Sequence, residues 1–246
     1  MPVITNLLLT LPRLGNTYLS RLSYSVMADV FSVSIEDDST HIGEYLPEVL
    51  KVVLSFPPTS DFLLSASWVQ VLSGALVAFN TVNQNSASLE VGSVWKAVWK
   101  FLDSPDANSR KASAQSLSAI STCFSPKLIS AAIADQENTT LLRKIILQVT
   151  KALDSLSYAQ AIPELLSVIS SIIMNLKYRE TKTAPTAAET LVIPLVVRIA
   201  DLRISKGFEY KEAADATLSV AMRVMGPEVL LKALPLNLEP GNRYVL

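Results

Sequence analysis

The sequence predicts an all-α protein, built as a right-handed α-solenoid of HEAT- or armadillo-like antiparallel helix pairs. Apolar residues recur at one-turn spacing along most of the chain, as in Tyr18, Leu22, Val26 and Val30. No stretch alternates convincingly between apolar and polar residues, and only 7 glycines are available for hairpins. Half of the 246 residues are hydrophobic and 17% are charged, which is typical of helices that face other helices.

The expected helices follow one another with short breaks of turn-forming residues. Apolar periodicity predicts helices near 18–30, 45–56, 68–79, 91–102, 107–120, 141–153, 162–173, 191–203 and 210–225. Proline, glycine and small polar residues separate them at 57–61, 83–86, 103–106, 125–126, 135–139, 182–186 and 205–208. We expect one continuous solenoid over residues 1–246, with HEAT-like pairs over 1–135. A second group of helices over 136–246 ends in the phrase Gly226–Leu238.

Three similar apolar phrases contain a proline and form a weak internal repeat. Pro47, Pro163 and Pro194 each follow a leucine or isoleucine within a helical pattern. Two interpretations remain open. The prolines kink helices of a curved stack, or they occupy the first turn of ordinary helices, where a missing N–H costs little.

The clearest single unit runs from Val94 to Ile120. A helix ends, the turn Asp103–Asp106 follows, and a helix rich in alanine and serine returns, so that it can approach its neighbours closely. Ser104 or Asp106 is expected to cap the returning helix. The unit resembles a HEAT repeat, in which an Asp of the turn and an Arg early in the second helix form a ladder between repeats. Asp103 and Arg110 occupy those two positions.

Composition restricts the classes of protein that fit. The net charge of −1 does not suit a protein that holds nucleic acid over its whole surface. The single cysteine excludes a disulfide within the chain, and the first residues lack a signal-peptide pattern. The apolar run from Trp68 to Phe79 is interrupted by polar residues and is shorter than the roughly 20 residues that span a bilayer. We therefore expect a soluble intracellular protein without a membrane partner.

No group of residues indicates catalysis, and we expect no catalytic residue, cofactor, metal or small-molecule substrate. His41 is the only histidine, and Cys123 has no histidine near it in the sequence. The acidic cluster Glu36–Asp38 lacks the spaced ligands of a calcium loop. Trp95 and Trp99 lie one turn apart, which favours a packed helix face, with an exposed stacking platform as the alternative.

Basic residues near helix ends are the candidate binding residues. One interpretation is that they complement helix dipoles. The other is that loops on one edge of the solenoid align as a basic ridge for RNA phosphates. The candidate RNA-binding residues are Arg110, Lys111, Lys177, Arg179, Lys182, Arg203, Lys206 and Lys211.

The closing phrase carries a family resemblance. Gly226-Pro227-Glu228, an apolar turn and Leu234-Pro235-Leu236-Asn237-Leu238, preceded by the helix pair 191–203 and 210–225, are similar to the ribosomal RNA processing protein twelve family. Leu46-Pro47 and the segment 55–58 look like the N-terminal solenoid of the same family. Because family members continue through further helices, the chain is expected to be an N-terminal or central fragment.

The resemblance implies a non-catalytic scaffold of the nucleus and nucleolus, with possible shuttling to the cytoplasm. Family members act in precursor-rRNA processing and in the maturation and export of pre-ribosomal subunits. The implied partners are pre-ribosomal RNA and particles, and ribosome-assembly or nuclear-transport proteins. One alternative is a nuclear-transport receptor or adaptor that binds protein cargo only, and another is an accessory subunit of an enzyme.

Overall fold

The computed structural model describes residues 2–34, 44–58 and 62–234. Within these ranges the chain forms α-helices and two 3-10 helices, and no strand. The helices are α1 (Pro2–Thr10), η1 (Leu11–Leu14), α2 (Thr17–Ser34), α4 (Leu46–Ser55), α5 (Phe62–Val82), α6 (Gln84–Trp99), α7 (Ala107–Ser121), α8 (Pro126–Ala134), α9 (Leu141–Leu153), η2 (Leu156–Ala161), α10 (Ile162–Asn175), α11 (Ala187–Leu191), α12 (Ile193–Ile204), α13 (Lys211–Met225) and α14 (Pro227–Ala233).

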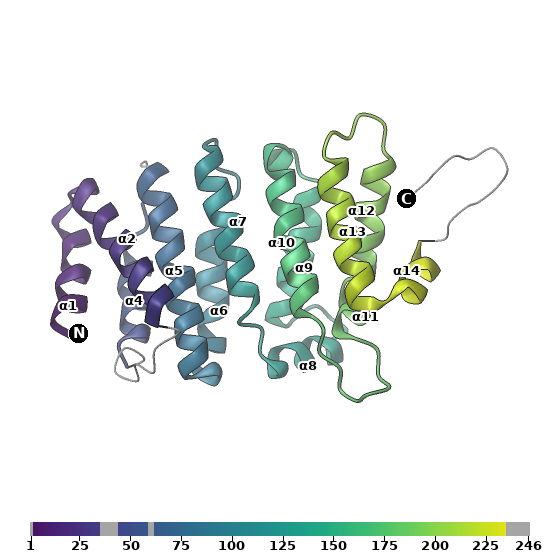
Figure 1. Cartoon of the computed structure of the whole chain (residues 1–246), viewed down its shortest axis with the longest axis horizontal. Helices are drawn as coiled ribbons and strands as arrows, with labels where there is room; N and C mark the ends of the chain where they lie inside the picture. The colour runs from purple at the N-terminus through teal and green to yellow at the C-terminus, as the bar shows by residue number, and fades with distance from the viewer. Residues whose placement is uncertain (1, 35–43, 59–61, 235–246) are drawn as a thin grey trace.

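The long helices stand side by side in an elongated stack, which confirms the predicted α-solenoid (Figure 1). In one layer α2, α5, α7, α10 and α13 each pack on the next, while α1, α4, α6, α9 and α12 pair with them from the other layer. The two helices of each pair, from the pair α1–α2 to the pair α12–α13, are connected at the same edge of the stack, which we call the upper edge. The chain passes to the next pair at the opposite edge, the lower edge, where the short helices α8 and α11 contact each other.

The three prolines start helices rather than bending them. Pro47, Pro163 and Pro194 are each the second residue of a helix, namely α4, α10 and α12. Backbone N–H groups in the first turn have no acceptor within the helix, so proline costs little there. The first-turn alternative is therefore correct, and the kink interpretation is wrong.

Three of the four residues of the apolar stripe expected on the first long helix face away from the core, whereas Val30 packs against it. Tyr18, Leu22 and Val26 of α2 are 65%, 44% and 45% exposed, whereas Tyr24, Met27 and Phe31 on its other side are at most 2% exposed. That second side packs on α5. Both sides of α2 carry apolar residues at one-turn spacing, so periodicity alone predicted the wrong side as the one that faces the core.

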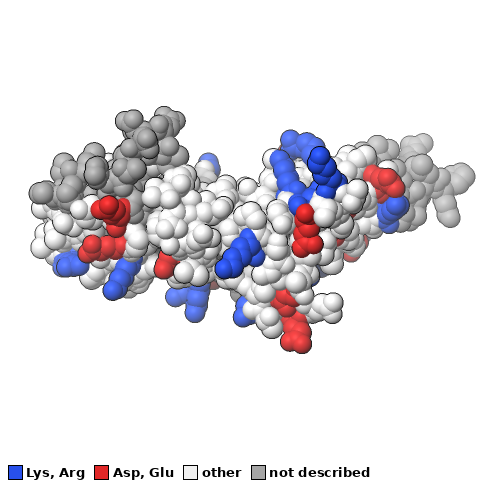
Figure 2. All heavy atoms as spheres, turned by 90° about the horizontal axis from the view of Figure 1, so that it is seen from below, with Lys and Arg blue, Asp and Glu red and all other residues white. Residues whose placement is uncertain are grey.

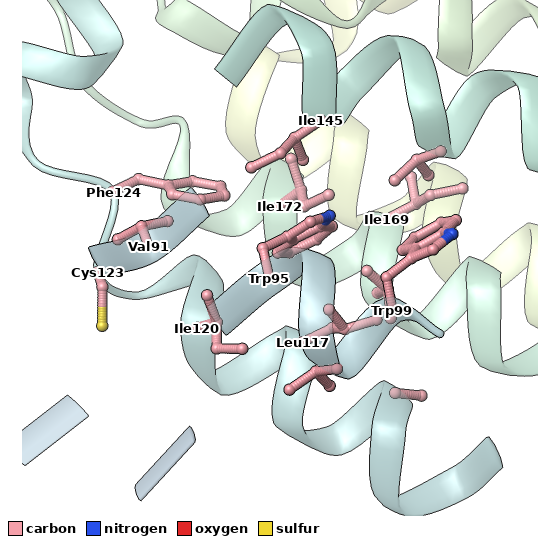
Figure 3. Close-up of a cluster of buried hydrophobic side chains, with 14 of the residues drawn as sticks. Val91, Trp95, Trp99, Leu117, Ile120, Cys123, Phe124, Ile145, Ile169 and Ile172 are labelled. Carbon is pink, nitrogen blue, oxygen red and sulfur yellow. The ribbon is translucent and has the colours of Figure 1, made fainter. Parts of the chain in front are cut away.

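Trp95 and Trp99 belong to the core, so the alternative of an exposed platform is wrong. They stack on each other with ring centroids 6.0 Å apart, and they are 2% and 6% exposed. Figure 3 shows them among apolar side chains from α7, α9 and α10. The indole N–H of Trp95 donates to Gln148 Oε1 at 3.2 Å, and that of Trp99 donates to Tyr158 Oη at 2.8 Å. The two residues thus connect the pair α6–α7 to the pair α9–α10.

The turn before α7 has the expected capping residues. Asp106 Oδ2 accepts a hydrogen bond from the backbone N–H of Ser109 at 2.7 Å, which caps the helix. Ser104 Oγ accepts from the backbone N–H of Asp106 at 3.2 Å and holds the capping residue in place. These bonds satisfy donors that the first helical turn leaves free.

Gly226 separates the last two described helices. Its φ of +92° lies in a region that glycine adopts readily, and it ends α13 at Met225. Pro227 then begins α14. The expected stop and restart are confirmed, while the rest of the closing phrase from Pro235 onward lies outside the described residues.

Two helical segments are long and apolar enough to cross a membrane by length and composition, namely Phe62–Val82 and Leu156–Asn175. A third arises if the bent pair α7 and α8 is counted as one span. The expectation that the apolar run around Trp68 is too short was wrong, because α5 extends it to 21 residues. In the stack, neighbouring helices cover much of both segments, with 56% and 44% of their most apolar windows buried.

Candidate nucleic-acid interface

The structure divides the eight candidate RNA-binding residues between two opposite edges. Arg110 and Lys111 in the first turn of α7, and Arg203, Lys206 and Lys211 around the α12–α13 connection, lie at the upper edge. The other three lie at the lower edge, in the connection between α10 and α11, and are Lys177, Arg179 and Lys182. A single ridge that contains all eight residues is therefore not formed.

Arg110 is used within the fold. Its Nη1 donates to the backbone carbonyls of Ser104 at 2.9 Å and Pro105 at 3.0 Å. Its Nε lies 3.8 Å from Glu164 Oε1 in the first turn of α10, and both side chains are less than one-fifth exposed. A link between neighbouring repeats is thus present, but its acidic partner is Glu164 and not Asp103. Asp103 is exposed in the turn before α7, and Arg110 points toward the next repeat.

Replacing Arg110 with alanine is expected to lower the free energy of unfolding by about 1–2 kcal/mol, because half-buried acceptors lose a charged donor. The neighbouring change Lys111→Ala is the control, since Lys111 is exposed and makes no ion pair within the described chain. Chemical denaturation followed by circular dichroism measures both. Equal stability of the two variants would contradict a structural role for Arg110.

Arg203, the other candidate arginine of the upper edge, is also paired. Arg203 binds Asp215 through Nε, and its Nη2 donates to the second carboxylate oxygen at 3.2 Å. This pair raises the pKa of Arg203 above its usual value. Lys206 and Lys211 are exposed, but Glu209 and Glu212 alternate with them along the chain. This connection is therefore mixed in charge, as is the connection between α10 and α11, where Glu180 is exposed between Lys177 and Lys182.

The lower-edge connection presents its lysines from an ordered loop. Arg179 Nη1 donates to the carbonyl of Ala184 at 2.9 Å, and its Nη2 lies 3.8 Å from Glu189 Oε1. Glu189 completes a capping box with Thr186 at the start of α11. Lys177 and Lys182 are exposed, and neither makes an ion pair with another described residue. Figure 2 views this edge and shows Lys and Arg side chains on it, several of them close together, with Asp and Glu side chains among them.

Two further lysines extend the basic surface of the lower edge. Lys127 lies one turn before Ser130 on α8, and Ser130 Oγ is 3.2 Å from Tyr178 Oη in the lysine-bearing loop. Lys144 is exposed in the first turn of α9, at the same edge. Sequence reasoning did not select Lys127. The helix start at Ser125-Pro126 was the available signal, because it places Lys127 in an exposed first turn. We call Lys127, Lys144, Lys177 and Lys182 the lower-edge lysines.

The residues considered for catalysis give no reactive site in the described part of the chain. Cys123 is fully buried, and burial raises the pKa of its thiol to about 11, which keeps it protonated near neutral pH. No group of three or more His, Cys, Asp or Glu residues within residues 2–34, 44–58 and 62–234 could hold a metal ion. His41 and Glu36–Asp38 lie outside the described residues.

Known proteins with a similar sequence share one name. A family model described as "Ribosomal RNA-processing protein 12, HEAT repeats" matches residues 103–244, which is more than half of the chain. The putative ribosomal RNA-processing protein 12 of Schizosaccharomyces pombe is 28% identical over 187 residues, or 76% of this chain. Ribosomal RNA-processing protein 12 of Saccharomyces cerevisiae is 23% identical over 260 aligned positions, covering 99% of this chain. The matches span 15% and 20% of the two relatives' lengths.

Proposed function

The chain belongs to the HEAT-repeat family of ribosomal RNA-processing protein 12, and we propose that it is a non-catalytic scaffold segment that contacts RNA in a pre-ribosomal particle. The relatives' names supply the ribosomal RNA context. The proposed partners are pre-ribosomal RNA and ribosome-assembly or nuclear-transport proteins, and the proposed locations are the nucleus and nucleolus. The chain would act by presenting a surface rather than by carrying out a chemical step.

The lower-edge lysines are the observation that carries the RNA contact. They are exposed, they make no ion pair with another described residue, and Arg179 anchors the loop that bears two of them. Ammonium groups in such positions bind phosphates by displacing condensed counterions, and this binding does not depend on sequence. Arg110 and Arg203 at the upper edge are already paired with Glu164 and Asp215. We therefore assign the RNA backbone to the lower edge.

The double change Lys177→Ala/Lys182→Ala is expected to weaken binding of a labelled single-stranded RNA. The slope of log K against log salt should become shallower by about 0.7 for each phosphate that the variant no longer neutralises. Fluorescence anisotropy between about 50 and 200 mM salt gives both the affinity and the slope.

The matched control is Lys206→Ala/Lys211→Ala, which removes the same charge from the upper edge. It should change RNA affinity much less than the lower-edge pair does. A larger loss in the control would place the RNA at the upper edge. RNA affinity of the unmodified chain that does not vary with salt would contradict the proposal and favour an adaptor that binds protein only.

A further inference from the structure

A hollow of about 350 Å³ opens at the upper edge, between the η2 segment and the α12–α13 connection. Its apolar floor includes Leu153, Ile162 and Leu202. Phe208 and Tyr210 line it from the α12–α13 connection, with ring centroids 6.0 Å apart and ring planes nearly perpendicular. Volume and lining suit one inserted apolar side chain, since protein-binding pockets are mostly apolar with few polar groups.

The ionisable side chains that line this hollow, Asp154, Glu209 and Tyr210, include two carboxylates, and no Lys or Arg lines it. Asp154 follows the C-terminal end of α9, where a carboxylate faces the negative end of the helix dipole. Arg198 holds it there, with Nε and Nη2 donating to Oδ1 at 2.9 and 2.5 Å. Glu209 is exposed and makes no ion pair among the described residues. Lys206 precedes Gly207 in the same connection but does not line the hollow.

Leu156 lines the hollow and is 93% exposed, the highest value among the large hydrophobic residues described. A single exposed leucine is ordinary on a protein surface. Here it adjoins an apolar pocket, so one partner segment can cover both. The apolar floor, the aromatic wall and the exposed leucine then form one continuous contact surface, with Glu209 as the unpaired carboxylate at its rim.

We propose that this hollow, the α12–α13 groove, docks a basic segment of a partner protein. One aliphatic or aromatic side chain of that segment fills the hollow against Phe208 and Leu156, and a flanking Lys or Arg side chain lies against Glu209. Asp154 is already paired with Arg198, so Glu209 is the carboxylate that opposes phosphate groups, and with no Lys or Arg in the lining it favours a basic peptide over nucleic acid at this site. This site is separate from the lower-edge lysines and does not depend on their binding RNA.

The test is a selection from a random-peptide display library on the whole chain, followed by titration of the selected peptides. The expected consensus is an apolar residue beside Lys or Arg. The variant Leu156→Asp/Glu209→Arg should weaken these peptides by about tenfold or more, because it removes an apolar contact and reverses a rim charge. Both positions are exposed, so the fold should be kept, and circular dichroism checks this.

Lys206→Glu is the matched control, since it changes charge in the same connection outside the hollow. The affinity of this variant for the selected peptides should be unchanged or higher. An acidic consensus, no enrichment, or equal binding by Leu156→Asp/Glu209→Arg would each overturn the proposal. A groove variant that loses RNA affinity, measured with the labelled RNA described above, would assign the surface to nucleic acid instead.

Discussion

Replacing Trp95 with alanine is expected to lower the free energy of unfolding by about 3–5 kcal/mol, as large-to-small changes of buried aromatic residues do. The side chain is 2% exposed and contacts the rings of Trp99 and Phe124, with centroids 6.0 and 6.4 Å away. Its loss would leave a cavity where α6 meets the following helices (Figure 3). It would also remove the donor to Gln148. Urea denaturation followed by circular dichroism measures the change.

Leu89→Ala on the same helix is the control, because Leu89 is 81% exposed and its truncation should cost less than about 0.5 kcal/mol. Trp95 also links the two groups of helices proposed over residues 1–135 and 136–246. In a stack each repeat is stabilised mainly by its neighbours, so a weakened junction should separate the unfolding of the two groups. Limited proteolysis should then cut the Trp95→Ala chain between α7 and α9. A single cooperative transition of unchanged midpoint would contradict both expectations.

The helices could be predicted from sequence because each long helix has an apolar face at a period close to 3.6. The sequence does not predict which neighbouring helix covers a given face. On α2, Tyr18, Leu22 and Val26 show the same spacing as a core face, yet α5 packs on the other side. Coverage depends on contacts between residues far apart in the sequence, and a periodicity within one helix does not contain that information.

The positions of the basic residues illustrate a second limit of prediction from the sequence. The connection that bears Lys177 and Lys182 and the one that bears Lys206 are separated by a single long helix, α12. One helix between two loops places them at opposite edges, so counting helices would have excluded a single ridge. The ion pairs of Arg110 with Glu164 and of Arg203 with Asp215 required the structure, because packing between elements determines them.

The buried small residues of α7 lead to two opposite predictions for stability, both for substitutions of Ser116. Ser116 is 2% exposed, and its Oγ has no hydrogen-bond partner among the described residues. A buried hydroxyl without a partner costs about 1–3 kcal/mol, so Ser116→Ala should leave stability unchanged or raise it. Ser116→Leu should lower the free energy of unfolding by about 2–3 kcal/mol, because added methylenes overpack a tight interface.

The interface is tight because α7 packs against both α5 and α10. Ala112, Ser113 and Ala114 are buried beside Ser116, and Ser113 Oγ donates to the carbonyl of Val98 at 2.9 Å. Gln115→Leu is the matched control, since Gln115 is exposed on the same helix and receives the same side chain. If Ser116→Leu were as stable as Gln115→Leu, α7 would have room to move outward. The close approach of successive helices in this layer would then not depend on the small residues of α7.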